Sequence, residues 1–562
     1  MTIQPSRQAL EKAVDELRKE KSEIQQELQE SQRKLRENEG LVSRQEAVDV
    51  SNIATMYFES TVPPESEVET LMMDPVYGSV RIEPRLSRLV RHGLFARLGS
   101  IRQLAFVSVE SANATHTRQA HSFGVSRFCE MAVDNFLRLD RIFVINSDKT
   151  ENFQLKSNEK TEFIFLAKVC GLLHDVGHAP FGHNLDRLVS TQILESREGG
   201  QRADKYFSAL YIRDFLKDTL ETIGVDPDVV IRILCPGFLS KPKETPYTKY
   251  LNIVKNVIDS DLDVDRIDYL VRDSMLTGLV LASLNPTALI HGMRPVVNDQ
   301  DGERIYSLAY DERVISHIEH AVYGRHSMYD HCYETDTRIA CETMLANCFR
   351  DFLEKSSRKI TELIKYTDED LLSHILRYGD DSSPARSLAR LLKLQRIYQT
   401  VFRQATNAEV RKGACLVVDE FLEERSENRV ADPMRRFDDW RDKIVEGILS
   451  KEERWKTLVS VTPADRNEQS GVINLYLLKK KNGVYLTQRI GEFKPRIAQI
   501  VREYTKSMPQ TRVFVHPLLE HRLVDAIRRS SEKFFEVVKK GGNAVRSGCY
   551  FRMTLSSWLV LP

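Results

Sequence analysis

The sequence lacks the features of membrane-spanning and secreted proteins. It contains no apolar run of about 18 residues, the length that a membrane-spanning helix needs, and no secretory leader. Its eight cysteines include no Cys-x-x-Cys pair and follow no regular spacing. We therefore expect a protein of the reducing cytoplasm that has no membrane partner.

An excess of charge of one sign is also absent, because 81 Lys and Arg residues balance 81 Asp and Glu residues. This balance gives no global electrostatic reason to expect nucleic acid or an anionic membrane as a partner, although a single groove can still be basic. The length of 562 residues predicts about three or four structural units. We place these units at residues 1–45, 46–350, 351–450 and 451–562.

The first unit has the apolar spacing of a coiled coil. Its apolar residues follow spacings of three and four among Glu, Gln, Lys and Arg, with Lys21 and Ser31 in the same seam: Leu10, Val14, Leu17, Ile24, Leu28 and Leu35. About four heptads are near the length at which such a helix needs a partner to cover its apolar stripe. The segment predicts a homo-oligomer or the recruitment of another protein. The alternative is a surface helix docked on the protein's own body.

The pattern from residue 51 to about residue 450 is mostly helical. Apolar residues recur at spacings of three and four in several segments: 123–137, 162–173, 206–222, 250–271 and 313–347. The polar stretch 146–160 is predicted to be a loop. Residues 351–450 contain Arg and Glu pairs at helical spacing, which are typical of a solvated helix face. The predicted fold class is therefore mainly α.

The last unit changes period. Two strand-like segments, 472–478 and 484–487, flank the Asn482-Gly483 dipeptide, which is a signal for a hairpin turn. Further elements are expected at 494–506 (helix), 511–515 (strand) and 519–539 (helix). Together they predict a small α/β unit at the end of the chain.

The densest group of chemically active side chains lies between residues 174 and 186. It contains His174, Asp175, His178, His183 and Asp186. The first two follow an apolar run that is long enough to be a buried helix, and ionisable groups at the end of a buried helix need a partner. A divalent metal is the simplest partner, because neutral imidazole and carboxylate both bind Zn, Fe or Mn. His121 and Asp265 are the candidates for the other ligands.

The order of His121, His174-Asp175 and Asp265 resembles the metal site of the HD-domain phosphohydrolases. Further segments are similar to motifs of the deoxynucleoside triphosphate triphosphohydrolases, a group that includes the bacterial dGTPases: 74–78, 97–103, 117–122, 178–183 and 263–273. The resemblance covers roughly Asp74 to Tyr333. It implies a helical HD-domain core and a divalent metal, either Mn, Fe, Zn or Mg.

The resemblance also implies a reaction and a set of roles. The implied reaction is attack at the α-phosphate of a dNTP, with dGTP as the first candidate, releasing a deoxynucleoside and inorganic triphosphate. His183, oriented by Asp186, is expected to protonate the leaving 5′-oxygen, and His178 belongs to the same catalytic motif. Residues at positions that bind the substrate in this group are Gln103, Arg118, Arg266, Tyr269, Asp273, Arg325 and Tyr333.

Some positions depart from the group. Asp204 or a neighbour stands where several members have a histidine, and Glu334-Thr335-Asp336 replaces a basic pair near the expected polyphosphate. Arg91 and Gly99 stand at positions where animal members of this group bind an activating guanine nucleotide. That activator site is therefore not expected in the same form. Two alternatives therefore stay open: an HD phosphodiesterase or nucleotidase with another phosphate ester as substrate, and a non-enzymatic scaffold or nucleic-acid-binding protein.

Overall fold

In the computed structural model, the described residues are 56–58, 69–189, 203–238, 245–279, 284–300, 303–356, 360–380, 383–405, 433–461, 475–499 and 510–540. The chain forms two compact units, residues 1–56 and 57–562. Only Met56 of the first unit is described, so the predicted coiled coil at 1–45 lies outside the described residues. The second unit holds all the other described residues.

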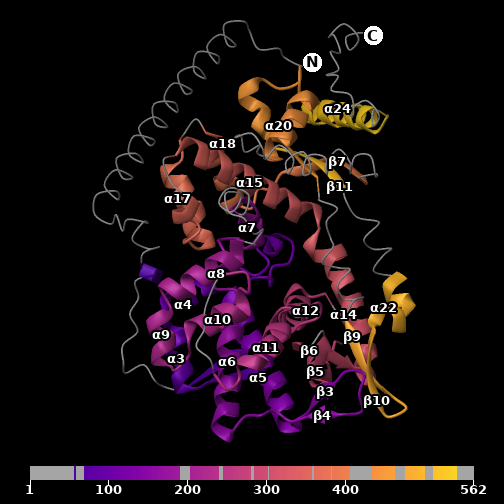
Figure 1. The fold of residues 1–562 in the computed structure, drawn as a ribbon. Helices are drawn as coiled ribbons and strands as arrows, with labels where there is room; N and C mark the ends of the chain where they lie inside the picture. The colour runs from indigo at the N-terminus through magenta and orange to yellow at the C-terminus, as the bar shows by residue number, and fades with distance from the viewer. Residues whose placement is uncertain are drawn as a thin grey trace, which may run out of the picture. The chain divides into compact units, whose positions relative to one another are not determined.

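Helices dominate the second unit (Figure 1), which confirms the predicted mainly α fold class. The helices before residue 330 are α3 (Pro84–Arg91), α4 (Gly93–Arg97), α5 (Arg118–Leu139), α6 (Ser157–Leu173), α7 (His183–Val189), α8 (Ala203–Asp214), α9 (Lys217–Thr222), α10 (Pro227–Leu234), α11 (Leu251–Ile258), α12 (Val264–Thr277), α13 (Pro286–Gly292) and α14 (Ile315–Met328). The later helices are α15 (Asp336–Lys355), α16 (Ile360–Leu363), α17 (Asp368–Tyr378), α18 (Pro384–Lys393), α20 (Pro433–Ile444), α22 (Ile490–Phe493) and α24 (His521–Lys540).

Helices α5 and α6 pack against each other and position the ends that carry the predicted ligands. The Thr117 side chain caps α5 by accepting a hydrogen bond from the Ala120 amide at 3.4 Å, so His121 lies in the first helical turn. Helix α6 is apolar and buried over most of its length, and it ends at Leu173. His174 therefore follows directly inside the protein, as the apolar run in the sequence predicts.

Helix α12 approaches α5 closely at Gly124. A Cβ atom at this position would lie 1.8 Å from Oδ1 of Asp268 on α12, so a larger residue would force the Asp268 side chain or its helix to shift. The side chain of Asp263 caps the start of α12 by accepting a hydrogen bond from the Arg266 amide at 2.8 Å. This cap places Asp265 in the first turn, on the side where α12 faces α5.

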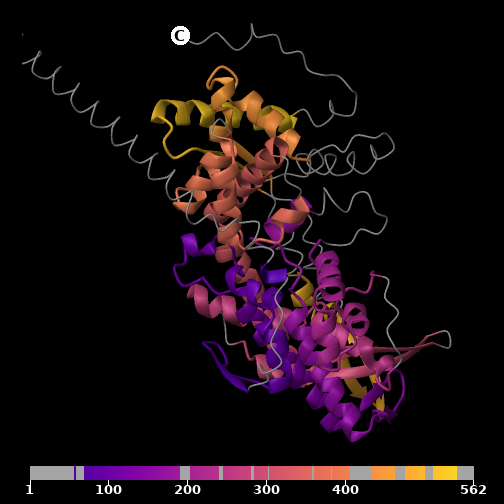
Figure 2. The ribbon, with the colours of Figure 1, turned by 90° about the vertical axis from the view of Figure 1, so that its left-hand side faces the viewer.

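A six-stranded sheet, in the order β10-β9-β6-β5-β3-β4, lies beside these helices. Its strands are β3 (Ile142–Val144), β4 (Thr150–Glu151), β5 (Met293–Gln300), β6 (Glu303–Asp311), β9 (Tyr476–Lys481) and β10 (Val484–Arg489). The β5–β6 hairpin extends from the helices as a long arm in Figure 2. The helical prediction for residues 51–450 did not include β3 to β6.

The predicted hairpin around Asn482-Gly483 is present as β9 and β10. The φ angles of 51° and 87° at Asn482 and Gly483 suit the tight turn that this dipeptide favours. However, β9 pairs in parallel with β6, through Tyr310 and Leu477. The boundary that we placed at residue 451 therefore does not separate the hairpin from the core sheet.

A three-stranded sheet, in the order β7-β11-β8, is formed by β7 (Gln399–Ala405), β8 (Thr457–Val461) and β11 (Gln510–Val515). Helices α20 and α24 pack on it, with Ile444, Val513 and Phe535 in the shared core. Strand β7 lies within 351–450, where the sequence predicted helices alone. The remaining hairpin consists of β1 (Thr70–Asp74) and β2 (Gly78–Ile82).

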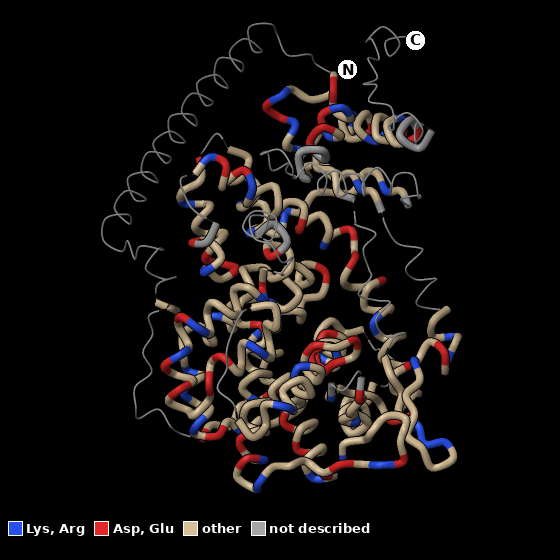
Figure 3. Tube along the Cα trace, in the orientation of Figure 1, with Lys and Arg blue, Asp and Glu red and all other residues tan. Residues whose placement is uncertain are grey.

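Acidic and basic residues are scattered among uncharged residues along the described chain trace (Figure 3), and the full sequence contains equal numbers of the two charges. Among the described residues, no helix combines the length and the apolar character that crossing a membrane requires.

Candidate metal centre

The four predicted metal ligands meet where α5, α6 and α12 converge. The Nε2 atom of His121 lies 2.9 Å from Oδ1 of Asp265 and 3.2 Å from Nε2 of His174. The Nε2 atom of His174 lies 3.3 Å from Oδ1 of Asp175 and 3.8 Å from Oδ1 of Asp265. His121, His174 and Asp175 are buried, whereas Asp265 is half-buried. His121, His174 and Asp265 therefore form a group that could hold one metal ion, and Asp175 adjoins this group through His174.

Each of the two histidines uses its other ring nitrogen for an oxygen inside the protein. The Nδ1 atom of His121 faces Oδ2 of Asp268 at 2.7 Å, and Nδ1 of His174 faces the carbonyl oxygen of Gly171 at 2.8 Å. Because these oxygens only accept, both Nδ1 atoms carry hydrogen, which leaves Nε2 of each ring as the nitrogen that a metal would bind. Two ring nitrogens and the neighbouring carboxylates so close together favour positive charge between them, which a proton on His121 or a bound cation can supply. The residues present therefore fit a divalent metal.

The raised pKa of His121 also indicates that the surroundings of this ring favour positive charge. Burial opposes the charged ring, yet Asp265 and Asp268 outweigh it and raise the pKa of His121 to about 10. Burial keeps the pKa of His174 below its usual value despite Asp175 and Asp265. The two rings differ because only His121 has a carboxylate at both nitrogens.

A chain of buried charges orients His121. Asp268 accepts hydrogen bonds from Nε and Nη2 of Arg272 at 2.9 and 3.1 Å, and Arg272 also binds Asp74 through Nη1 at 2.9 Å. Arg272 and Asp268 have no exposed surface. A carboxylate that holds the far nitrogen of a ligating histidine fixes the tautomer and increases the basicity of the ring. Asp268 and Asp74 lie in segments that resembled the triphosphohydrolase motifs, but the sequence alone did not indicate this role.

Asp175 connects the metal ligands to the predicted catalytic histidines. Its Oδ2 atom accepts a hydrogen bond from Nη1 of Arg118 at 2.6 Å, and its Oδ1 atom lies 3.2 Å from Nε2 of His178. Burial opposes its charge, but His174, His178 and Arg118 together hold the pKa of Asp175 well below its usual range. Asp175 is therefore a carboxylate at any ordinary pH.

His178, His183 and Asp186 form a second cluster of groups that can hold a metal. Asp186 faces Nδ1 of His178 at 2.5 Å and accepts a hydrogen bond from the Ala179 amide at 3.1 Å, while it lies 3.7 Å from Nδ1 of His183. Burial and Arg118 oppose a charge on His178, but Asp186 and Asp175 raise its pKa to about 9. The sequence paired Asp186 with His183, whereas the shorter contact joins Asp186 to His178.

The loop between these two histidines turns sharply. Phe181 and Gly182 have φ angles of 58° and 54°, and a Cβ atom at Gly182 would lie 2.3 Å from Nη2 of Arg118. Glycine is needed here because the Arg118 guanidinium lies directly against the backbone. His183 begins α7 with a side chain that is 54% exposed, so it is the one histidine of the cluster at the surface of the site.

Predicted sugar-reading residues converge on Asp273. The Tyr333 hydroxyl donates a hydrogen bond to Oδ2 of Asp273, and Nε2 of His116 lies 2.8 Å from Oδ1. The ring of Tyr269 meets that of Tyr333 edge to face at 6.5 Å. The backbone amide of Gln103 donates to the His116 carbonyl oxygen at 3.0 Å, so Gln103 adjoins the same group. The sequence did not indicate His116. Its position two residues before Arg118 was the only available signal.

Several buried polar atoms of these residues have no hydrogen-bond partner among the described residues. They are Nε of Arg118, Nε and Nη1 of Arg325, Oε1 of Gln103 and Nδ1 of His116. Buried donors and acceptors without partners are costly, so they indicate places where a ligand completes the bonding. Arg325 lies over the Tyr329 ring at 5.7 Å, and a five-residue π-helix, Tyr329–Tyr333, leads from there to Tyr333.

The remaining predicted positions are bound to other parts of the protein. Arg266 donates hydrogen bonds through Nη1 to Asp263, at 2.5 Å, and to the Ser260 carbonyl oxygen. Asp204 is buried, and its carbonyl oxygen lies against Gly177 in the loop after the metal ligands. Asp336 pairs with Nε of Arg512 on β11 at 2.7 Å. The acidic segment after Tyr333 is therefore directed in part toward the three-stranded sheet.

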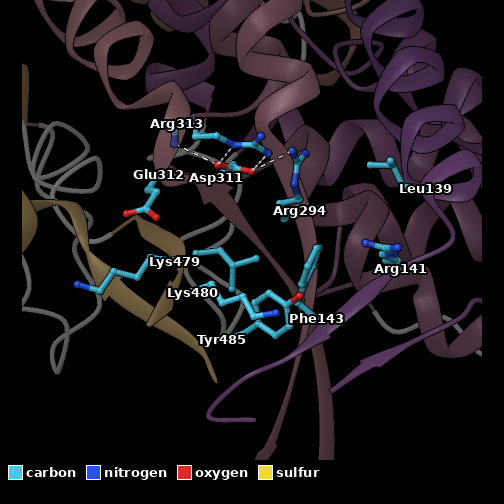
Figure 4. Close-up of a pocket in the computed structure, with 11 residues that line it drawn as sticks. Leu139, Arg141, Phe143, Arg294, Asp311, Glu312, Arg313, Lys479, Lys480 and Tyr485 are labelled. Atoms are coloured by element: carbon cyan, nitrogen blue, oxygen red, sulfur yellow. Dashed lines mark hydrogen bonds and ion pairs between the residues drawn. The ribbon is translucent and has the colours of Figure 1, made fainter. Parts of the chain in front are cut away.

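A pocket lies apart from these residues, between α5, β3, β5, β6 and the β9–β10 hairpin (Figure 4). It has a volume of about 350 Å³ and contains the aromatic rings of Phe143 and Tyr485. Asp311 on its wall bridges Arg294 and Arg313. None of the predicted site residues lines it.

Comparison with known proteins decides the domain type. Residues 118–273 match the family model described as HD domain. The chain contains an HD domain. The match begins at Arg118 and ends at Asp273, so it includes all four ligand positions and the His178, His183 and Asp186 cluster.

The relatives of the HD domain are distant. An uncharacterized protein of Mycoplasma genitalium is 26% identical over 283 residues, which cover 49% of this chain and 59% of that protein. Human deoxynucleoside triphosphate triphosphohydrolase SAMHD1 is 22% identical over 406 residues, which cover 66% of this chain and 61% of the human protein. The matches thus span less than two thirds of either relative.

The fold also matches a solved structure. The crystal structure of a hypothetical protein from Aquifex aeolicus superimposes with a TM-score of 0.55 and 19% sequence identity, covering 82% of this chain and 100% of that one. At this identity the likeness shows the fold alone.

Proposed function

We propose that this chain is a metal-dependent phosphohydrolase that converts deoxynucleoside triphosphates to deoxynucleosides and inorganic triphosphate. The observation that carries the proposal is the pair of Nε2 atoms of His121 and His174, 3.2 Å apart beside the carboxylates of Asp175 and Asp265. The relationship to a named dNTP triphosphohydrolase supports the choice of substrate class. The resemblance to the dGTPases makes dGTP the first substrate to test.

His121, His174, Asp175 and Asp265 would hold the metal. A bound divalent metal supplies a Lewis acid for the phosphoryl oxygen and lowers the pKa of a bound water. Arg118 keeps Asp175 ionised and oriented through the 2.6 Å hydrogen bond, and its Nε atom remains available to a phosphate oxygen. Arg325 offers two further buried donors of the same kind. These guanidinium groups would offset the negative charge of the triphosphate.

The reaction forms one bond from a water oxygen to the α-phosphorus and breaks the bond from that phosphorus to the 5′-oxygen. The leaving 5′-oxygen needs a proton, and an imidazole suits this transfer near neutral pH. We assign the transfer to His183, which is the exposed member of its cluster. His178 and Asp186 hold the loop that carries it, because Asp186 binds both the His178 ring and the Ala179 amide.

Asp273 would accept a hydrogen bond from the sugar 3′-hydroxyl while Gln103 binds the same group. Tyr269 and Tyr333 form the wall beside the sugar, where a ring packed against C2′ leaves no room for a 2′-hydroxyl. The donors on Asp273, from His116 and Tyr333, keep its carboxylate in a fixed orientation. This wall is the part of the proposed site that distinguishes a dNTP from an NTP.

The deciding experiment is incubation of the protein with each dNTP and NTP in the presence of Mn, Mg, Fe or Zn, with chromatography of every product. We expect a deoxynucleoside and intact triphosphate in equal amounts. Orthophosphate or a nucleoside monophosphate would instead support a nucleotidase or phosphodiesterase. Asp175→Ala should abolish the activity, and activity that persists in this variant would contradict the assignment of the site.

Residues 1–45 are predicted to form a homo-oligomer or to recruit a protein partner. Light scattering of the full chain and of a chain that starts at residue 46 tests this prediction. We expect the shorter chain to have the smaller assembly if the coiled coil joins the copies. Equal assemblies would mean that the segment serves another partner or docks on the protein's own body.

A further inference from the structure

Asp368 reaches the site from outside the HD domain and outside every predicted position. It is the first residue of α17 and is buried, with 5% of its surface exposed. Its Oδ1 atom accepts a hydrogen bond from the Phe181 amide at 2.6 Å, and its Oδ2 atom accepts one from the Arg102 amide at 2.9 Å. Each oxygen therefore holds a different segment of backbone.

The two segments belong to the two sides of the proposed substrate site. Phe181 lies between His178 and His183, in the loop that turns through positive φ angles. Arg102 precedes Gln103 and forms a β-bridge with Thr117, so its segment pairs with the start of α5. One carboxylate thus joins the loop of the catalytic histidines to the segment of the sugar-binding glutamine.

The start of α17 does not need the Asp368 side chain. Thr367 caps this helix by accepting a hydrogen bond from the Asp370 amide, and the Asp370 side chain accepts one in return from the Thr367 amide. This reciprocal pair satisfies the amides of Thr367 and Asp370. Asp368 is free to direct both of its oxygens away from α17.

The neighbouring segment is tied to the same loop by a second contact. The buried guanidinium of Arg97 donates through Nη2 to the carbonyl oxygens of His178, at 2.7 Å, and of Ile364, at 2.8 Å. Its Nε atom donates to the Tyr366 carbonyl oxygen at 3.2 Å. The chain from Ile364 to Asp368 is therefore bound to the catalytic loop at both of its ends.

We propose that Asp368 is a positioning residue, which sets the distance between the catalytic loop at Phe181 and the sugar-binding segment at Arg102–Gln103. This inference rests on the proposed function for its kinetic consequence, but the tie between the two loops is a property of the protein itself. A carboxylate is suited to the task because both of its oxygens only accept. In Asp368→Asn, the amide NH2 would face one of the two backbone N–H groups, and one hydrogen bond would be lost.

The test compares Asp368→Asn with Asp370→Asn in the full-length chain. The control variant removes a charge from the same helix, two residues away, at a side chain that accepts hydrogen bonds from Thr367, and its amide oxygen can still accept them. Hydrogen–deuterium exchange would be followed by mass spectrometry in peptides that contain Arg102 and Phe181. We expect at least tenfold faster exchange in one or both peptides for Asp368→Asn, and no change there for Asp370→Asn.

The same variants are then assayed with dGTP and with 2′,3′-dideoxyguanosine triphosphate. Because small misplacements of catalytic groups have large kinetic costs, we expect kcat to fall by about 10- to 100-fold in Asp368→Asn. The preference for the substrate with a 3′-hydroxyl should fall as well, while the Asp370→Asn values stay near those of the wild type. Loss of metal from Asp368→Asn would indicate general disruption and would overturn the proposal.

The outcomes separate the two proposals. If the wild-type protein cleaves no dNTP, the proposed function fails, and the exchange data alone decide the role of Asp368. If the wild type is active and the two variants behave alike in exchange and kinetics, the inference about Asp368 fails. Should Asp368→Asn not fold, Asp368→Ser, which also removes the buried charge and keeps one acceptor, takes its place.

Discussion

His121 and His174 face each other through Nε2 atoms 3.2 Å apart, while the Nδ1 atom of each ring is held by an oxygen of the protein. This relationship makes metal affinity depend on a residue that touches no metal. Asp268 binds the Nδ1 atom of His121, on the side of the ring away from the metal position, and accepts a hydrogen bond from Arg272. Asp268→Asn should therefore weaken metal binding by about 10- to 100-fold. Calorimetric titration with Mn or Zn measures this, with Asp134→Asn on the surface of α5 as control.

A second prediction concerns the residues around Asp273, which are proposed to bind the sugar of the substrate. His116 binds Oδ1 of Asp273 at 2.8 Å, opposite the Tyr333 hydroxyl. In His116→Asn, the side chain is too short to place a donor where Nε2 of His116 lies, so Oδ1 is left without a good donor. We expect kcat/KM for a dNTP to fall by about tenfold, as for one lost hydrogen bond to a charged group. The dideoxynucleotide should be affected less. His291→Asn, at an exposed position on α13, should leave both values unchanged. Equal losses for both substrates would contradict this role.

A third prediction tests the close approach of α5 and α12. Gly124→Ala would place a methyl group 1.8 Å from the Asp268 carboxylate, so either the buried Asp268 side chain or helix α12 must shift. We expect a loss of about 1–3 kcal/mol in the free energy of unfolding, with weaker metal binding. Urea titration measures the free energy of unfolding. Gly99→Ala is the control, because its methyl group meets only the end of the Gln119 side chain, at 3.0 Å. Similar losses in both variants would mean that the approach of α12 is not the cause.

The four candidate ligand positions could be proposed from the sequence because each lies in a segment with its own recognisable neighbours, and the structure brings three of them, His121, His174 and Asp265, into one group. The supporting residues could not, because their partners are far apart in the chain. His121 meets Asp268 across 147 residues, His116 meets Asp273 across 157, and Phe181 meets Asp368 across 187. Nothing in the local pattern around Asp368 distinguishes it from an ordinary helix start.

The helical periodicity predicted most helices but none of the strands β3 to β6. Strands β5 and β6 lie between helices, and their pairing partners include β9, which follows about 170 residues later. Such pairing is decided by tertiary contacts and not by local preference. The Asn482-Gly483 turn was recognisable because its conformation depends on those two residues alone.

A fourth prediction concerns the junction between α15 and the three-stranded sheet. Asp336 binds Nε of Arg512, whose side chain is 2% exposed, and Arg403 lies 3.6 Å from the same carboxylate oxygen. Removing the negative charge leaves two guanidinium groups near each other with less compensation. Asp336→Asn should lower the free energy of unfolding by about 1–3 kcal/mol. Asp299→Asn, in an exposed pair with Arg304, should cost less than about 0.5 kcal/mol. An unfolding curve that matches this control would show that Arg512 needs no counter-charge.

The last prediction follows from the burial of Asp368. Burial raises the pKa of Asp368 to about 6. The hydrogen bonds from the Arg102 and Phe181 amides, and the positive charges of Arg118 and Arg102, lower this pKa in part. Arg97 is the other cation that faces Asp368. In the unfolded chain its pKa is near the ordinary value of about 4. The folded protein thus binds this proton more tightly than the unfolded chain does. The contribution of protonated Asp368 to the stability of the folded protein is fully present below about pH 4 and is lost as the pH rises to about 6.

Asp368→Asn cannot lose a proton at this position, so the variant should not share this change. Between pH 4 and pH 7, the free energy of unfolding of the wild type should therefore fall by about 3 kcal/mol relative to that of Asp368→Asn. Each pKa unit corresponds to about 1.4 kcal/mol. Urea titrations of both proteins at each pH measure the difference, and all other titrating groups cancel. A difference that does not change with pH would mean that Asp368 ionises as readily in the folded protein as in water. A shift of the expected sign would show that the protein keeps a charged carboxylate here at a cost in stability, as expected of a residue that is retained for the geometry of the site.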